Sequence, residues 1–312
     1  MDKIAIVLPV HNRKSITLDC LEHLQDISRE GYAAETVVVD DGSTDGTSEA
    51  IAQKYPDITI LKGDGNLWWA GSVNTGFRYA LDNAFDFVYT LNDDIEFFPD
   101  TLQVLYDTLK DRRDCVCSSI FLGFRERDKI VYAGVEVHGF FKKLRSSFEG
   151  PFRDEYKGWI QEADTLTTKS TLTPTDIIKK AGLMDAEHLP HNFADFDYFL
   201  RVKSAGYSVL VNFGSRIVSR GSDTDFFHLI LNKNLKEVFR TFFDIKYTNH
   251  LRTMYYYATL RENFIKGHIL FLHNLIPFAV GLALKVVLPK KWLERLITKT
   301  GRLKNVHVEQ SP

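Results

Sequence analysis

The first hundred residues alternate between short, continuous apolar runs and stretches with helical periodicity. The apolar runs are rich in β-branched and aromatic residues and occupy positions 4–10, 36–40, 58–61 and 87–91. Runs of this length that are apolar throughout are typical of strands buried on both faces. Helical patterns separate them, and Ser72 is the expected N-cap of the helix before the fourth strand. The alternation predicts an α/β fold with a mostly parallel central sheet flanked by helices.

The rest of the chain is less regular. Residues 122–165 carry scattered aromatic, glycine and charged residues, and we interpret them as a sheet extension with acceptor-facing loops. Helical patterns return from Thr175 and again at 195–206. A long helical region follows from about 229 to 300 and ends in a basic segment.

This pattern predicts two regions. An α/β domain is expected over residues 1–228, divided into halves at about 1–120 and 121–228. Residues 229–312 are expected to form a C-terminal helical region with a basic amphipathic tail.

Composition excludes few classes of protein but narrows the setting. With 44% hydrophobic and 26% charged residues, the chain has the composition of a folded globular protein. A net charge of −2 gives no general attraction to nucleic acid, so no nucleic-acid partner is expected. The three cysteines, Cys20, Cys115 and Cys117, have no CxxC spacing, which favours a reducing compartment. The apolar run at 4–10 is too short for a usual signal sequence, so a cytoplasmic location is expected.

Acidic residues follow two of the predicted strands directly. Asp40-Asp41 lie at and after the end of the second strand, and Asn92-Asp93-Asp94 follow the fourth. Ligands bind at the carboxyl ends of strands in open parallel sheets, so both clusters fall where a site is expected. Turn chemistry alone also explains Asp residues at such places. Adjacent carboxylates repel one another unless a cation meets them, and Mg²⁺ commonly takes one or two carboxylates together with substrate phosphates.

A third acidic cluster opens the helix predicted at 195–206. Asp195 and Asp197 either complement the helix dipole or include a general base that removes a proton from an attacking hydroxyl.

Taken in order, these segments are recognisable. They read PVHNR at 9–13, VVVDDGSTDGT at 37–47, GNLWWAGSVNTGF at 65–77, LNDD at 91–94, and KKAGLMDAEHLPHNFADFDYFLRVKSAGY at 179–207. As an ordered set they resemble the inverting GT-A family of bacterial nucleotide-sugar transferases, family 2 of the glycosyltransferases. The segment RTMYYYATLRENF at 252–264 adds a resemblance to its rhamnosyltransferase-like branch.

The resemblance implies that residues 1–228 form a GT-A catalytic domain, with a nucleotide-binding half at about 1–120 and an acceptor half at 121–228. It also implies roles for individual residues on the donor side. The residues expected to line the nucleotide or donor are Pro9, His11, Asn12, Arg13, Asp40, Asp41, Gly71, Asn74 and Asp93. Among them, Asp40 or Asp41 is expected to contact the nucleobase and Asp93 the ribose. Asp94 corresponds to the family's metal ligand, for Mn²⁺ or Mg²⁺, and Asp195 to its catalytic base.

The chain departs from the family pattern at two places. The usual Glu-Asp pair before the base is Ala194-Asp195 here. Where many members carry a His after the next strand, this chain has Ser219-Arg220. That leaves a third protein ligand to the metal open, although Arg220 can neutralise a phosphate directly. His228 is an alternative ligand, but a surface or core His is the more ordinary interpretation.

Trp68 and Trp69 have two interpretations. Paired tryptophans are often core residues because they bury so much area. The alternative is an apolar platform under a sugar ring, which their place beside Gly71 favours. Together with Asp197, they are the residues expected on the sugar and acceptor side.

The resulting hypothesis is an inverting glycosyltransferase of cell-surface polysaccharide or glycolipid synthesis. It would transfer rhamnose or a hexose from a dTDP- or UDP-linked donor to a glycan or lipid-linked acceptor hydroxyl. A dehydrogenase is disfavoured because no GxGxxG follows the first strand. An inactive scaffold is disfavoured because Asp94 and Asp195 are both present, and a nucleotidyltransferase because PVHNRKS is not Gly-rich.

The tail predicts a membrane contact. Residues 269–288 (ILFLHNLIPFAVGLALKVVL) are about as long as a membrane span but contain polar residues. Six cations and one acid follow: Lys290, Lys291, Arg295, Lys299, Arg302 and Lys304, with Glu294. Such a segment suits peripheral docking at the inner face of the cell membrane. The alternative is a helical hairpin packed on the catalytic domain or on a partner subunit in a homodimer.

Overall fold

The computed structural model describes residues 1–219 and 226–299. Their contacts divide these residues into two compact units. The first comprises residues 1–190 and 194–219, and the second comprises residues 191–193 and 226–299.

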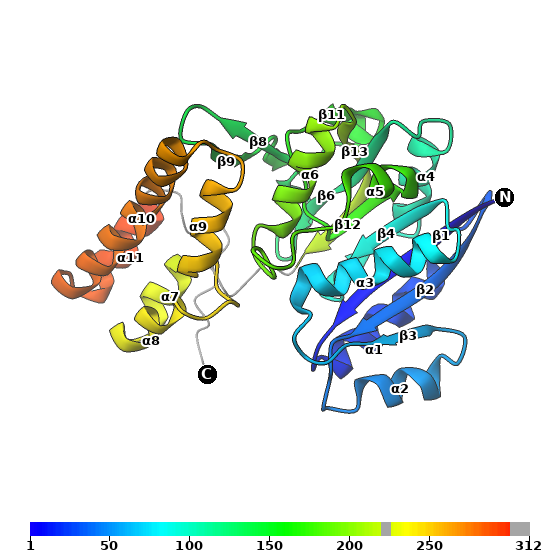
Figure 1. The fold of residues 1–312 in the computed structure, drawn as a ribbon, viewed down its shortest axis with the longest axis horizontal. Helices are drawn as coiled ribbons and strands as arrows, with labels where there is room; N and C mark the ends of the chain where they lie inside the picture. Colours follow the sequence, from blue (N-terminus) through cyan, green and yellow to red (C-terminus); the bar gives the residue numbers. More distant parts are fainter. Residues whose placement is uncertain (220–225, 300–312) are drawn as a thin grey trace. The chain divides into compact units, whose positions relative to one another are not determined.

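The first unit is built on a mixed sheet with helices on both faces (Figure 1). Its strands are β1 (Asp2–Val10), β2 (Tyr32–Asp40), β3 (Thr59–Lys62), β4 (Phe87–Leu91), β5 (Ile95–Phe97), β6 (Cys115–Gly123), β7 (Lys129–Tyr132), β8 (Val135–His138), β9 (Lys143–Ser146), β10 (Gly150–Pro151), β11 (Ile160–Glu162), β12 (Ser170–Pro174) and β13 (Ser208–Ser219). Its helices are α1 (Lys14–His23), α2 (Thr47–Lys54), α3 (Trp68–Asp82), α4 (Thr101–Leu109), α5 (Thr175–Ala181) and α6 (Ala194–Ser204), with 3-10 turns at Leu24–Asp26 and Asp154–Gly158.

The α/β sheet predicted from the sequence is confirmed, and its two halves differ. The main path of the sheet runs β10-β7-β6-β12-β4-β1-β2-β3. β1 pairs in parallel with both β2 and β4, and β2 with β3, as the apolar runs indicate. β12 lies between β4 and β6 and is antiparallel to both. The second half is therefore mixed, and the amino end of β12 lies beside the carboxyl end of β4.

Alternation along β1 explains how two layers of helices cover the sheet. Ile4, Ile6 and Leu8 face a core shared with apolar residues of α1, α2 and α4. Val7 points to the opposite face and meets α3, where a Cβ added to Gly76 would lie 2.3 Å from the Val7 side chain. Because a strand presents alternate residues to opposite faces, one apolar run serves both layers.

Two boundaries differ from the sequence prediction. β2 begins at Tyr32 rather than 36, because its first residues pair with β1 before β3 begins to pair at Val37, so they are less uniformly apolar. α3 begins at Trp68, so Ser72 lies inside the helix and not at its N-cap. The Trp68 amide, the first of α3, and the Leu67 amide before it are instead satisfied by the carboxylate of Asp41, which directly follows β2.

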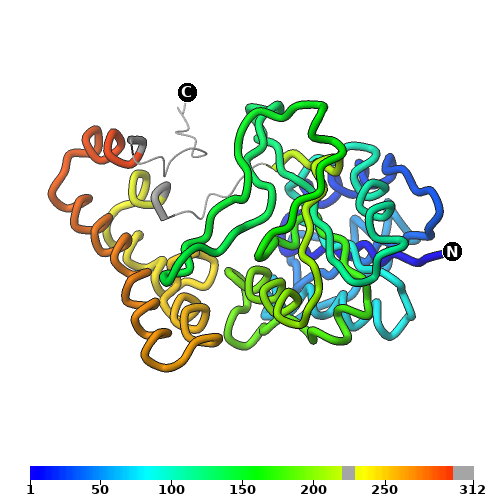
Figure 2. The backbone as a smooth tube through the Cα atoms, turned by 90° about the horizontal axis from the view of Figure 1, so that it is seen from above, coloured from blue at the N-terminus to red at the C-terminus, as the bar shows by residue number. Residues whose placement is uncertain are grey.

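The irregular region at 122–165 contains β7 to β11. β8 and β9 form a separate two-stranded antiparallel ribbon, which extends from the main sheet (Figure 2). This agrees with the predicted sheet extension.

The second unit is a helical bundle. Its helices are α7 (Phe226–Asn232), α8 (Leu235–Thr241), α9 (Leu251–Thr259), α10 (Phe264–Val287) and α11 (Lys290–Lys299). They share an apolar cluster in which Val238 and Phe242 of the α8 region meet Leu293 and Ile297 of α11. Leu293 and Ile297 of the basic helix α11 therefore pack within the second unit.

Candidate active site

The loops that follow β1 and β2 are tied together by hydrogen bonds. The Asn12 amide donates to Ser43 Oγ at 2.8 Å, and the Thr44 amide donates to Asn12 Oδ1 at 2.7 Å. His11 Nδ1 lies 2.6 Å from the Asp41 carbonyl oxygen. Asn12 holds a left-handed backbone (φ 51°), which Asn tolerates better than most residues. The predicted donor residues at 11–13 thus form a fixed edge beside the β2 loop.

Asp40 and Asp41 are both buried and both fully engaged. Asp40 accepts hydrogen bonds from the Ser43 amide and the Ser48 hydroxyl. Asp41 accepts three backbone amides, those of Gly65 (2.8 Å), Leu67 (3.2 Å) and Trp68 (2.9 Å). Asp41 therefore caps α3 from a distant strand, which also supports the left-handed backbone of Trp68 (φ 55°).

Asp93 is buried at the end of β4 and is paired with Arg13. Arg13 Nη1 lies 3.1 Å from Asp93 Oδ1, and the Thr17 hydroxyl donates to Asp93 Oδ2 at 3.1 Å. Burial raises the pKa of Asp93 to about 6; the charge of Asp94 adds to this, and Arg13 opposes it. The structure thus joins Arg13 and Asp93, two residues predicted for the nucleotide side.

Asp94 has a different environment. Arg13 Nη2 lies 3.7 Å from its Oδ2, and Lys169 Nζ lies 4.0 Å from its Oδ1. Its Oδ1 is buried and, among the described residues, accepts no hydrogen bond. The same holds for the side-chain oxygen of the neighbouring Asn92. Two buried oxygens without a donor suit a cation or a ligand that supplies positive charge.

Asp195 lies in the first turn of α6, partly buried. Its carboxylate accepts the Phe196 amide at 2.9 Å and also the Thr168 amide. Burial raises the pKa of Asp195 to about 6, while these amides and the charge of Lys169 lower it. The Trp69 indole donates to Thr168 Oγ1 at 2.9 Å, so Trp69 is attached to the residue that holds Asp195.

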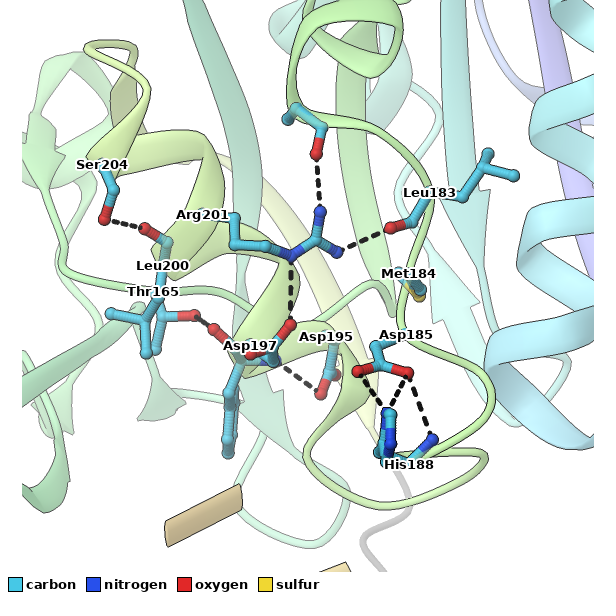
Figure 3. Close-up of polar contacts among 12 residues, drawn as sticks. Thr165, Leu183, Met184, Asp185, His188, Asp195, Asp197, Leu200, Arg201 and Ser204 are labelled. Atoms are coloured by element: carbon cyan, nitrogen blue, oxygen red, sulfur yellow. Dashed lines mark hydrogen bonds and ion pairs between the residues drawn. The ribbon is translucent and has the colours of Figure 1, made fainter. Parts of the chain in front are cut away.

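Asp197 faces a different partner. Its carboxylate is buried and accepts a hydrogen bond from Arg201 Nε at 3.1 Å (Figure 3). The other guanidinium nitrogens of Arg201 donate to the carbonyl oxygens of Ala181 (2.6 Å) and Leu183 (2.7 Å). The Asp197–Arg201 pair thereby ties α6 to the chain that follows α5.

Ala70 and Asn74 of α3 hold the segment leading to the base, and Gly71 lies between them. The Asn74 side chain both accepts from the Met184 amide (2.8 Å) and donates to its carbonyl (2.9 Å). The Ala70 amide donates to the Pro190 carbonyl at 2.9 Å. Gly71 is buried, and a Cβ there would lie 3.2 Å from the Leu67 Cβ. Asn74 thus sets the path of the chain before Asp195, whereas Gly71 allows close packing against Leu67. Both residues are predicted near the donor.

Three residues of the site were missed from the sequence: Thr17, Thr168 and Lys169. Lys169 Nζ lies 4.0 Å from Asp94 and 3.5 Å from Ser219 Oγ, and its backbone carbonyl accepts the Asn92 amide at 3.3 Å. This place follows from the antiparallel pairing of β12 with β4, which the predicted parallel sheet did not include. Arg220, predicted to bind a phosphate, lies outside the described residues, and the side chain of His228 is likewise not described.

The acidic residues fit a divalent cation with few protein ligands. Within residues 1–219 and 226–299, no three His, Cys, Asp or Glu side chains gather as a metal cluster. Mg²⁺ commonly keeps several waters and takes one or two carboxylates plus substrate phosphates. The Oδ1 of Asp94, which accepts no hydrogen bond from the described residues, is therefore sufficient as a protein ligand.

Comparison with known proteins identifies the family. The glycosyl transferase family 2 profile matches residues 5–162, which is half of the chain. A search of curated proteins found no match. One similar solved structure is GalNAc-T7 with UDP, GalNAc and Mn²⁺, with a TM-score of 0.56 and 13% identity over 70% of this chain. At this identity the likeness shows the GT-A fold alone, and this chain spans only 43% of the length of that chain.

The chain belongs to glycosyl transferase family 2. It has a GT-A fold with a mixed central sheet and C-terminal helices. The match confirms the family and the fold that the sequence resemblance predicted.

Proposed function

We propose that this glycosyltransferase works by inversion, with Asp195 as the base. It transfers rhamnose or a hexose from a dTDP- or UDP-linked donor to a hydroxyl of a glycan or lipid-linked acceptor. The resemblance of residues 252–264 to the rhamnosyltransferase-like branch supports rhamnose. The reaction takes place on the cytoplasmic side of the membrane, in cell-surface polysaccharide or glycolipid synthesis.

The observation that carries this proposal is the adjacency of Thr168 and Lys169. The Thr168 amide holds the Asp195 carboxylate, and the next residue places its ammonium 4.0 Å from Asp94. Two adjacent residues at the start of β12 therefore link the candidate base to the strand end that receives the diphosphate. An attacking hydroxyl and a leaving phosphate need groups arranged in this way on either side of the anomeric carbon.

In the reaction, the acceptor oxygen attacks the anomeric carbon from the face opposite the diphosphate. Asp195 accepts the hydroxyl proton, the new glycosidic bond forms, and the bond to the diphosphate oxygen breaks with its electron pair leaving on that oxygen. Arg13 and Lys169 lie beside Asp93 and Asp94, where their charges favour the departing anion. When bound at Asp94, Mn²⁺ or Mg²⁺ supplies further positive charge to the diphosphate.

The environment of Asp195 suits a base at neutral pH. With a pKa of about 6, the carboxyl is mostly ionised at pH 7, yet it is more basic than an ordinary Asp.

The direct test is Asp195→Asn, which keeps the shape of the side chain but cannot accept a proton. Transfer should fall by about 10²–10⁴-fold, with nucleotide binding close to that of the wild type. Asp176→Asn, at an exposed site on α5 where Asp176 pairs with Lys179, is the matched control. An Asp195→Asn enzyme that keeps most of its turnover would contradict the role of the base, and a product with retained anomeric configuration would exclude inversion.

Donor identity is tested by thermal-shift screening of dTDP-rhamnose and UDP-hexoses with Mn²⁺ or Mg²⁺. Assays with and without acceptor then separate the alternatives. Release of nucleoside diphosphate that increases with acceptor supports transfer. Release of pyrophosphate from dTTP or UTP together with a sugar 1-phosphate indicates a nucleotidyltransferase. Binding of the nucleotide sugar without turnover indicates an inactive scaffold.

A further inference from the structure

Helix α10 has one face that packs within the second unit and an opposite face that is exposed. Its inner face packs within the second unit: a Cβ on Gly267 would lie 3.0 Å from Thr259 Cα, the Phe271 ring meets the Tyr255 ring at 5.3 Å, and the Phe278 ring meets the Phe242 ring at 6.0 Å. Further along, the Lys285 ammonium donates to the Ile230 carbonyl. Helices α7 and α9 therefore accompany α10 along one side (Figure 1).

The opposite face is apolar and exposed along the whole helix. We call it the outer stripe, and it consists of Ile265, Ile269, Leu272, Ile276, Val280, Ala283 and Val287. These positions recur every three or four residues, so they lie on one side of the helix over about 36 Å. Leu272 is 62% exposed and Ile276 56% exposed. The outer stripe contains no polar or charged residue.

An exposed apolar surface of this length marks an interaction site rather than an ordinary solvated surface. Helix α10 is also long and apolar enough to span a membrane, and only 11% of its most apolar stretch is buried. Spanning does not suit its inner face, however. α7 packs there and Phe242 at the end of α8 meets Phe278, and the residues in and next to α7 and α8 expose charges such as Lys233, Lys236 and Arg240. Charges of this kind are costly in hydrocarbon.

The charges on α11, which follows the C-terminal end of the outer stripe in the chain, indicate the partner of this surface. Lys290, Lys291 and Arg295 of α11 are exposed, and Glu294 is the acid of that helix, at 4.0 Å from Lys290. Trp292, 61% exposed, lies among these cations. Cations and a tryptophan beside an apolar stripe complement the anionic headgroups and the acyl boundary of a bilayer. A second copy of the chain would instead bring a surface of the same positive charge.

We infer that the outer stripe of α10 lies in the interface of an anionic lipid bilayer, with Lys290, Lys291 and Arg295 against the headgroups. The helix is parallel to the membrane plane, and the C-terminal unit docks without spanning. Docking is independent of the chemistry at Asp195. Its consequence, delivery of the enzyme to a lipid-linked acceptor, rests on the proposed function.

Point substitutions test this better than truncation, because removing residues 269–312 would also remove Leu293 and Ile297 from the apolar cluster of the second unit. The test is flotation of the full-length protein with phosphatidylcholine vesicles, with and without phosphatidylglycerol. Wild-type protein should float with the anionic vesicles. Leu272→Glu/Ile276→Glu should lower the bound fraction at least about tenfold, because ionised groups are costly in the acyl boundary. Ile160→Glu, at a 48% exposed apolar position on β11 of the first unit, is the matched control and should bind like the wild type.

A second variant tests the charges. Lys290→Gln/Lys291→Gln/Arg295→Gln should weaken binding to anionic vesicles by roughly fivefold for each cation and should flatten the salt dependence. Melting temperatures close to that of the wild type would show that both variants fold.

Two results would overturn the inference. One is vesicle binding by the Leu272→Glu/Ile276→Glu protein equal to that of the wild type. The other is a wild-type protein that ignores vesicles but forms a dimer that these substitutions dissociate, which would assign the outer stripe to a second copy. Loss of vesicle binding with intact transfer to a soluble acceptor separates this inference from the proposed function, which Asp195→Asn tests without membranes.

Discussion

The carboxyl ends of β2 and β4 carry acid pairs that look alike in sequence but differ in structure. Asp40 and Asp41 both accept hydrogen bonds, and Asp41 alone holds three backbone amides at the start of α3. At β4, Asp93 is paired with Arg13, whereas Asp94 keeps a buried oxygen that accepts no hydrogen bond from the described residues.

This difference separates an acid that builds the site from an acid that has capacity left for a ligand. A carboxylate saturated by amides stabilises the fold and has little to offer a cation. A carboxylate with a free buried oxygen is costly by itself and gains when positive charge arrives. An Asp-Asp pair therefore stabilises the fold at the end of β2 but forms a candidate ligand site at the end of β4.

The largest expected effect on binding follows from removing the Asp94 carboxylate. Asp94→Ala should lower transfer by about a hundredfold or more and weaken metal-dependent binding of nucleoside diphosphate. Asp197→Ala is the control, because its carboxylate is engaged by Arg201. Calorimetry with and without Mn²⁺ measures the difference. Wild-type activity that survives a chelator would show that Arg13 and Lys169 neutralise the diphosphate without a metal.

Stability should show the reverse order at the two strand ends. Asp41→Ala leaves the buried amides of Gly65, Leu67 and Trp68 without their acceptor and should cost about 2–3 kcal/mol of unfolding free energy. Asp94→Ala should change it by less than about 1 kcal/mol, because it also relieves repulsion with Asp93. Denaturant unfolding of both variants measures this, and equal losses would remove the distinction drawn between the two acid pairs.

Lys169 should connect the β4 end to the base through its charge. Lys169→Met removes a cation that lowers the pKa of Asp195, so that pKa should rise and the acid limb of the rate profile should move to higher pH. Lys169→Arg should keep the limb near its wild-type position. Lys179→Met on α5, where Lys179 pairs with Asp176, is the control. If the acid limb of the pH–rate profile is unchanged in Lys169→Met, Lys169 does not influence the pKa of the base.

The smallest expected effect is on stability as a function of pH. Asp93 and Asp195 have folded-state pKa values of about 6, above the ordinary value of 3.8, so the folded state binds protons more readily than the unfolded state. Their ionisation destabilises the fold above pH 6, and this penalty disappears as the pH falls from 6 toward 4. Relative to the wild type, Asp93→Asn should reduce the part of the stability gained on acidification. This prediction would be contradicted if the melting temperatures of the wild type and of Asp93→Asn changed in parallel between pH 4 and 7.

The sequence indicated the first half of the fold well, because its central strands β1 and β4 are buried on both faces over most of their length. Ile4 to Val10 is apolar throughout and Phe87 to Leu91 contains one polar residue, Thr90, and such runs have few alternatives in a folded domain. It indicated the N-terminus of α3 poorly. A local N-cap was expected at Ser72, but the cap is Asp41, 27 residues before Trp68 in the chain. No local pattern contains that contact.

By itself, the sequence determined the family, the parallel half of the sheet and the acidic residues that follow β2 and β4. These depend on short-range patterns: apolar runs set the strands, and chain order sets which residues follow them. Only the tertiary structure decided which carboxylates are saturated and which is free, and that Lys169 lies beside Asp94. Those properties depend on pairing between strands far apart in sequence, here β12 against β4, and on the direction of that pairing. The same applies to α10, whose composition suits burial or membrane, because exposure of its outer stripe depends on which side the neighbouring helices cover.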